Sequence, residues 1–269
     1  VCLMGDDGTV IQREVDILDT RPESAWTSGH LPSAVRIDWE EFTPEEKSDR
    51  GELLDDVSEL QEKLRALGVD EDRPVLVVGA PPDHWGEDGR IVWMLRTLGH
   101  RRTALVDGGH EAVVEAGIEE TDDAHSPEPG NVEVEPRDEW RIDREGVRSL
   151  VEEQPEGVVL VDTRSAREFA GATPYGETRP GHIPGAKHLH YRRLLDERGR
   201  LLDEQDLRGR LESAGIRESD RVIAYCTGGV RSAWLTVVLE SLGYDAANYA
   251  GSAWDWAAAS DERHPLVDR

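Results

Sequence analysis

The sequence contains very little lysine. Only three of its 31 basic residues are lysines (Lys47, Lys63 and Lys187), whereas Asp and Glu number 57, which gives a formal net charge of −26. Such a surface repels the phosphates of nucleic acids and of anionic membranes, so we expect neither as a partner. The same composition is typical of halophilic proteins, because high salt screens the self-repulsion. An acidic protein from a GC-rich genome is the alternative.

Cysteine and long apolar runs are scarce as well. Cys2 and Cys226 are the only cysteines among 269 residues, and they form neither a Cys-x-x-Cys pair nor a cluster with histidines. The sequence therefore predicts no metal site, no other cofactor and no disulfide framework. No apolar run approaches the length of a membrane span, and no basic and apolar leader opens the chain. We expect a cytoplasmic protein with a free thiol at Cys226; its oligomeric state is left open.

The chain contains an internal repeat. Three short patterns occur in both halves in the same order: Asp-Thr-Arg at 19–21 and 162–164, Gly-His-x-Pro at 29–32 and 181–184, and Leu-x-x-Leu-Gly at 95–99 and 239–243. In both halves, apolar strand patterns alternate with helical ones, such as the leucines of 53–67. This alternation predicts an α/β fold with a mostly parallel sheet flanked by helices in each half. We place the two domains at 1–120 and 137–269, joined by an acidic, Pro- and Gly-containing linker at 121–136.

Cys226 stands where a predicted strand (222–224) meets a predicted helix (233–239). Glycines next to it let the backbone turn its N–H groups inward, and the first N–H groups of a helix have no intrahelical partner. Both features favour a thiolate, and Arg231 adds a fixed cation. The alternative is a buried cysteine that acts as a small hydrophobe. We predict a nucleophile cradle formed by Cys226, Thr227, Gly228, Gly229, Val230, Arg231 and Ser232.

The first half serves as an internal control for this loop. At the position of Cys226 it has Gly79, and the loop 79–89 contains three acidic residues and two prolines. The first domain is therefore expected to lack the chemistry and to support the second domain or shape its entrance. Features shared by both halves are better explained as framework, and we assign Asp162 and His182 to structural support on this ground.

With these patterns the chain resembles the rhodanese family of sulfurtransferases, in the two-domain form in which only the C-terminal domain is active. The segment Gly251–Trp256 adds to the resemblance, which covers nearly the whole chain. It implies two tandem rhodanese-like domains and a double displacement, in which a sulfane sulfur passes from a donor such as thiosulfate to Cys226 as a persulfide. The acceptor would be cyanide or a thiol. Arg231, Arg164 and Arg179 are candidates to attract an anionic donor.

Four residues separate Cys226 from Arg231, whereas related phosphatases have five, so we expect sulfur transfer rather than phosphate-ester hydrolysis.

The loop and Glu168 both depart from the pattern of 3-mercaptopyruvate transferases. The negative charge of a glutamate at this position would repel the carboxylate of that substrate. The loop also departs from the usual thiosulfate pattern, because basic residues do not follow the cysteine directly. We favour thiosulfate. The alternatives are 3-mercaptopyruvate transfer, a persulfide carrier for a partner protein, and a redox sensor. Because few residues precede the first strand, we expect an abbreviated edge of the first domain or a truncated sequence.

Overall fold

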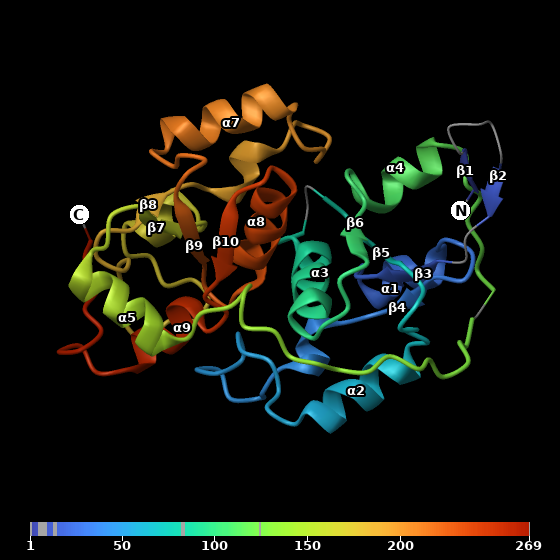
Figure 1. Cartoon of the computed structure of the whole chain (residues 1–269), viewed down its shortest axis with the longest axis horizontal. Coiled ribbons are helices and arrows are strands. Elements are labelled where there is room, and N and C mark those ends of the chain that lie inside the picture. Colours follow the sequence, from blue (N-terminus) through green and yellow to red (C-terminus); the bar gives the residue numbers. More distant parts are fainter. Residues whose placement is uncertain (1, 5–9, 13–14, 82–83, 124, 269) are drawn as a thin grey trace.

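Two four-stranded parallel sheets form the centres of the two halves (Figure 1). The computed structural model describes residues 2–4, 10–12, 15–81, 84–123 and 125–268. In the first domain the strand order is β4 (Val35–Arg36), β3 (Asp16–Asp19), β5 (Val75–Val78), β6 (Thr103–Leu105). In the second it is β8 (Lys187–His188), β7 (Val158–Asp162), β9 (Arg221–Tyr225), β10 (Asp245–Asn248). The two orders correspond strand by strand, which confirms the predicted α/β fold with a duplicated parallel sheet.

Helices flank both sheets. The first domain contains α1 (Glu23–Ser28), η1 (Trp39–Phe42), α2 (Val57–Ala66), α3 (Glu87–Thr97) and α4 (Gly109–Glu115). The second contains α5 (Arg144–Glu153), α6 (Ala166–Phe169), η2 (Tyr191–Leu194), α7 (Glu204–Ser213), α8 (Val230–Ser241) and α9 (Ser252–Ala258). Ahead of β3, the strands β1 (Cys2–Met4) and β2 (Val10–Gln12) pair with each other in an antiparallel manner.

Helices α3 and α8 lie side by side between the two sheets (Figure 1). Helix α3 follows β5 and α8 follows β9, the equivalent inner strands of the two sheets, so the loops that lead into the two helices are equivalent. The backbones of the two helices approach each other closely at Gly89, where an added Cβ would stand 2.5 Å from Cα of Trp234. A glycine is required here because any side chain would force the two helices apart. This packing brings the first domain against the loop that contains Cys226.

The described residues of the predicted linker, 121–123 and 125–136, run along the first domain (Figure 1). The N–H of Gly130 donates to the carbonyl of Arg65 at 2.8 Å, and the N–H of Glu135 donates to the carbonyl of Leu98 at 3.0 Å. Val132 is 1% exposed and belongs to the first core. The C-terminal part of the segment is thus attached to the first domain, while the domain boundaries themselves stay a prediction.

Within the described part of the chain, no helix combines the length and the apolar character that crossing a membrane requires. The same residues contain no group of three or more His, Cys, Asp or Glu side chains arranged to hold a metal ion.

Candidate active site

Cys226 directly follows β9, and a tight turn then leads into α8. The turn depends on Gly229, whose φ of 74° lies in the left-handed region and whose missing Cβ would stand 2.3 Å from the carbonyl oxygen of Ala250. A side chain at this position would therefore be strained and would also collide with backbone. The cysteine is 1% exposed, so its sulfur lies at the bottom of the turn rather than on the surface.

The sulfur of Cys226 is surrounded by hydrogen-bond donors. The Ser232 hydroxyl lies 3.5 Å from Sγ, and the backbone N–H groups of Ser232 and Gly228 also point at it. Burial acts to raise the pKa of the Cys226 thiol, but the charge of Arg231 and these donors outweigh burial and hold the pKa below its ordinary value. The cradle therefore favours the thiolate, the form of cysteine that acts as a nucleophile.

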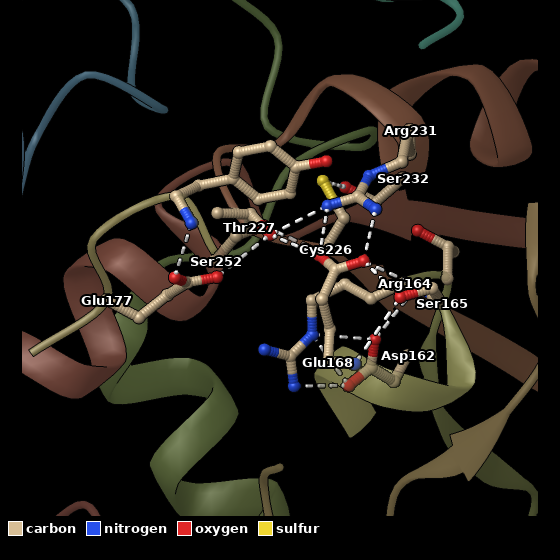
Figure 2. Close-up of polar contacts among 12 residues, drawn as sticks. Asp162, Arg164, Ser165, Glu168, Glu177, Cys226, Thr227, Arg231, Ser232 and Ser252 are labelled. Carbon is tan, nitrogen blue, oxygen red and sulfur yellow. Dashed lines mark hydrogen bonds and ion pairs between the residues drawn. The ribbon is translucent and has the colours of Figure 1, made fainter. Parts of the chain in front are cut away.

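Arg231 is held in place by two acceptors (Figure 2). Its guanidinium donates to both carboxylate oxygens of Glu168, at 2.8 and 3.0 Å, and to Oγ1 of Thr227 at 2.7 Å. The Thr227 hydroxyl in turn donates to Oε1 of Glu168 at 3.0 Å. This closed triangle fixes the cation next to the thiol, and the Glu168 carboxylate neutralises much of its charge.

Glu168 is positioned by the start of α6. It forms a capping box with Ser165, in which the Ser165 hydroxyl and N–H donate to Oε2 of Glu168 at 2.6 and 3.0 Å. Burial would raise the pKa of Glu168, but the hydrogen bonds and charge of Arg231 outweigh it and lower the pKa to about 2. The carboxylate is consequently ionised throughout the neutral range.

The turn at the start of α9 supports the cysteine loop from behind. Ser252 has a φ of 54°, unusual for a residue with a side chain, and its hydroxyl accepts the N–H of Cys226 at 3.0 Å. The N–H groups of Ala253 and Trp254 donate to the carbonyls of Cys226 and Thr227, at 3.1 and 2.9 Å. These contacts hold the loop carbonyls against α9, which leaves the loop N–H groups of Gly228 and Ser232 facing the sulfur.

A cavity of about 40 Å³ opens above the cysteine loop. Cys226, Thr227, Gly228, Val230 and Arg231 line it from the loop, and Tyr175 and Trp254 line it from elsewhere in the second domain. The first domain contributes Trp39 and Trp85. Residues of the first domain therefore line the cavity above Cys226, which is consistent with the expectation that this domain supports the second or shapes its entrance.

Comparison with known proteins bears on both halves. The model of the family described as Rhodanese-like domain matches residues 5–116 and 146–259. The chain belongs to the rhodanese family. The expectation of two tandem rhodanese domains is therefore confirmed, with one four-stranded parallel sheet in each.

Relatives of this rhodanese carry sulfur-transfer names. It is 31% identical to the sulfur carrier protein TtuD of Thermus thermophilus, over 92% of this chain and 87% of the relative. A Haloferax volcanii protein provisionally named thiosulfate sulfurtransferase is 31% identical over 93% and 87%. A Pseudomonas aeruginosa protein provisionally named 3-mercaptopyruvate sulfurtransferase is 31% identical over 90% and 85%. The family is thus one of sulfurtransferases and sulfur carriers.

A solved structure shares the fold. The ergothioneine complex of EanB/Y353A superposes with a TM-score of 0.82 at 19% identity, covering 95% of this chain. This chain spans only 65% of the length of that one. At this identity the likeness shows the fold alone.

Arg164 and Arg179, which the sequence suggests as attractants for the anionic donor, instead make contacts that hold the backbone in place. Arg164, 2% exposed, binds the Asp162 carboxylate at 2.7 Å and donates to the Gly181 carbonyl at 2.9 Å. Arg179 donates to a set of backbone carbonyls, those of Trp256, Ala257, Ala259 and His264. Neither lines the cavity above the thiol. We now assign both arginines to positioning the backbone rather than to binding the donor.

The framework contacts recur in the half without a cysteine. Arg21 binds Asp19 at 2.7 Å and the Gly29 carbonyl at 2.8 Å, as Arg164 does with Asp162 and Gly181. The Nδ1–H of His182 donates a hydrogen bond to the Phe169 carbonyl, and its ring stacks on the Phe169 ring; His30 makes the same two contacts with Trp26. This duplication supports the structural interpretation of Asp162 and His182.

Sequence reasoning missed the partner of Arg231 and the contributions of the first domain. The sequence suggests only that Glu168 is unfavourable to a substrate carboxylate. The Ser-x-x-Glu spacing at 165–168 indicates a capped helix start, but the contact of Glu168 with Arg231 depends on the fold. Nothing in the sequence neighbourhood of Trp39 or Trp85 places them above a cysteine from the other domain.

Proposed function

We propose that this rhodanese transfers a sulfane sulfur from thiosulfate to a thiophilic acceptor through a persulfide on Cys226. The thiolate attacks the outer sulfur of thiosulfate, so an S–S bond to the cysteine forms while the S–S bond of the donor breaks, and sulfite leaves with the electron pair. Cyanide or a thiolate then attacks the terminal sulfur of the persulfide, and the Cys226 thiolate is the leaving group.

The donors gathered around the Cys226 sulfur carry this proposal: the Ser232 hydroxyl, 3.5 Å from Sγ, the N–H groups of Ser232 and Gly228, and the charge of Arg231 act together to lower the pKa of the thiol. A lowered thiol pKa increases the thiolate fraction at neutral pH, so the first displacement depends less on a general base. The terminal sulfur of a persulfide is also anionic, and the donors around Sγ are arranged to stabilise negative charge there without reorganising.

The size and charge of the cavity favour a small donor. Because Glu168 occupies the fork of Arg231, that cation is not free to bind a substrate carboxylate in a bidentate manner. Lys47 of the first domain lies over Trp254, a residue that lines the cavity, with Nζ 5.5 Å from the ring centroid, and its side chain is exposed. We assign to Lys47 the attraction of the anionic donor into an otherwise acidic protein.

Two other candidates have specific support. The Pseudomonas aeruginosa relative is named for 3-mercaptopyruvate, and the Thermus thermophilus relative is named as a sulfur carrier. A carrier would accept the sulfur on Cys226 but would release it slowly to small acceptors, and would deliver it to a partner protein instead.

Steady-state kinetics separate the three candidates. With cyanide as the acceptor, the thiosulfate hypothesis predicts thiocyanate formation at a higher kcat/KM from thiosulfate than from 3-mercaptopyruvate, and no formation by Cys226→Ser. A preference for 3-mercaptopyruvate would reassign the donor. Stoichiometric sulfur uptake without turnover would favour the carrier, and full activity of Cys226→Ser would refute all three.

A further inference from the structure

The segment Gly51–Glu52 of the first domain is pressed against the turn that holds the cysteine loop. A Cβ added to Gly51 would stand 2.1 Å from the carbonyl oxygen of Ala250. The adjacent residue, Glu52, accepts the N–H of Gly251 on its Oε1 at 2.8 Å. The next residue in the turn is Ser252, whose hydroxyl accepts the N–H of Cys226 at 3.0 Å. A continuous path of contacts therefore leads from the first domain to the backbone of the nucleophile.

Arg90 of the first domain holds the segment Gly51–Glu52 in place. It is fully buried in α3, its Nη2 donates to the carbonyl of Gly51 at 2.7 Å, and its guanidinium stacks over Trp93 at 4.5 Å from the ring centroid. Among the described residues its Nε and Nη1 have no hydrogen-bond partner. A buried cation needs nearby negative charge, and Glu52 and the Cys226 thiolate supply it. Arg90 thus fixes Gly51 by a hydrogen bond and places a positive charge that interacts with the charges of Glu52 and Cys226.

From these contacts we propose that Glu52 and Arg90, both in the domain without a cysteine, are positioning residues for the sulfur cradle. They hold the turn 250–252 against the cysteine loop, so that the strained Ser252 keeps its hydrogen bond to the Cys226 N–H. With that contact in place, the N–H groups of Gly228 and Ser232 converge on the sulfur. The inference builds on the proposed function, because it gives the first domain a role in preparing the thiolate.

The pH at which Cys226 becomes reactive tests this role, because the sign of the shift distinguishes positioning from simple electrostatics. Removing a carboxylate near a thiolate lowers the pKa of the thiol if only charge matters. If Glu52 instead holds the turn, Glu52→Ala loosens the donors around Sγ and raises the thiol pKa. Glu52→Gln retains an oxygen that can accept the Gly251 N–H, so its thiol pKa stays at or slightly below the wild-type value.

The internal repeat provides a matched control. In the cysteine-free half, Asp107 belongs to the equivalent turn, and its Oδ1 accepts the N–H of Leu201 of the other domain at 2.7 Å. Asp107→Ala therefore also removes one hydrogen bond between the domains, but at a turn that supports no thiol. A general weakening of the domain contact would affect both variants alike.

The experiment measures the rate of Cys226 alkylation by iodoacetamide against pH, together with thiosulfate–cyanide kinetics and the melting temperature of each variant. We expect a higher midpoint pH and about a tenfold lower kcat for Glu52→Ala, with Glu52→Gln and Asp107→Ala close to wild type. An unchanged or lower midpoint in folded Glu52→Ala, or an equal rise in Asp107→Ala, would overturn the proposal. If Glu52→Ala does not fold, Glu52→Asp, whose carboxylate is withdrawn by one methylene, gives the same comparison.

The alkylation midpoint does not depend on which sulfur donor the enzyme uses. A rhodanese that proved to prefer 3-mercaptopyruvate, or to act as a carrier, would still show the predicted shift in Glu52→Ala. Conversely, an unshifted midpoint with normal thiocyanate formation in the wild type would refute the positioning role alone.

Discussion

The Arg231 guanidinium is bound in a bidentate manner by the Glu168 carboxylate, at 2.8 and 3.0 Å, beside the thiol that it helps to ionise. The two residues are 8% and 4% exposed in their side chains, so the pair is buried. The cation of the cradle is therefore present but largely neutralised, and Glu168 sets how much of its field reaches the sulfur and the donor.

Replacing Glu168 by Gln should lower the pKa of the Cys226 thiol. The variant removes the negative charge that opposes the thiolate, while the amide oxygen and Thr227 still hold Arg231. It also leaves a buried cation without its counterion, so the melting temperature should fall. The midpoint of alkylation against pH and a thermal melt measure the two effects. Glu204→Gln, which alters an exposed pair with Arg208, should change neither; a higher midpoint in Glu168→Gln would contradict this account of the pair.

Reversing the charge at Lys47 should weaken the binding of an anionic donor. Lys47→Glu is expected to raise KM for thiosulfate several-fold at low salt, with kcat unchanged and the effect shrinking as salt is added, because the interaction is exposed and screened. Lys47→Arg should behave like the wild type. Lys63→Glu, at an exposed helical pair with Glu59, is the matched control. An equal rise of KM in both charge reversals would mean that only the overall charge matters.

A methyl group added at Gly228 should distort the cysteine loop, because it would collide with the Trp254 ring. The new Cβ would stand 2.3 Å from the Trp254 ring, so either the loop or the ring must move. We expect a large loss of kcat/KM in Gly228→Ala and partial recovery when Trp254→Ala is added, since the smaller side chain removes the clash. A double-mutant cycle measures the interaction, and strictly additive losses would show that the two positions act independently.

Asp88 should make the stability of the protein depend on pH. It is buried in α3 beside Gly79, the position that corresponds to the cysteine, and burial raises the pKa of Asp88 to about 7. The folded protein therefore binds this proton more tightly than the unfolded chain, and stability falls as pH rises from about 4 to about 7.

Asp88→Asn cannot titrate and should lose this part of the pH dependence. Relative to the wild type it should be more stable at about pH 8 than at about pH 5, by on the order of a few kcal/mol in the difference. Urea unfolding at both pH values gives the comparison, and Asp138→Asn, at an exposed site, should show no such difference. The same relative stability at both pH values would refute the assignment.

Much of the fold could be predicted because it depends on local patterns. The apolar runs before Asp19 and Asp162 became β3 and β7, and the duplicated motifs predicted the duplicated sheet. Element ends were less accurate. The leucine spacing over 53–67 predicts a longer helix than α2, which begins only at Val57 because the Asp56 side chain caps it.

The cysteine loop could be predicted for the same local reason, since strand, glycines and helix start are consecutive in the chain. Its surroundings could not. Glu52, Trp39 and Trp85 belong to the other domain, and their nearness to Cys226 depends on how α3 packs on α8. Arg164 illustrates the converse: an arginine near the right strand end suggested a substrate contact, but the fold commits it to Asp162 and Gly181.

The central claim is that Cys226 accepts a sulfane sulfur. Intact-protein mass spectrometry after exposure to thiosulfate, with desalting under mild conditions, tests it most directly. The account predicts that the wild type gains the mass of one sulfur atom, that peptide mapping places it on Cys226, that cyanide removes it, and that Cys226→Ser does not gain it. A wild-type protein that gains no sulfur, or a Cys226→Ser variant that gains it equally, would contradict the account.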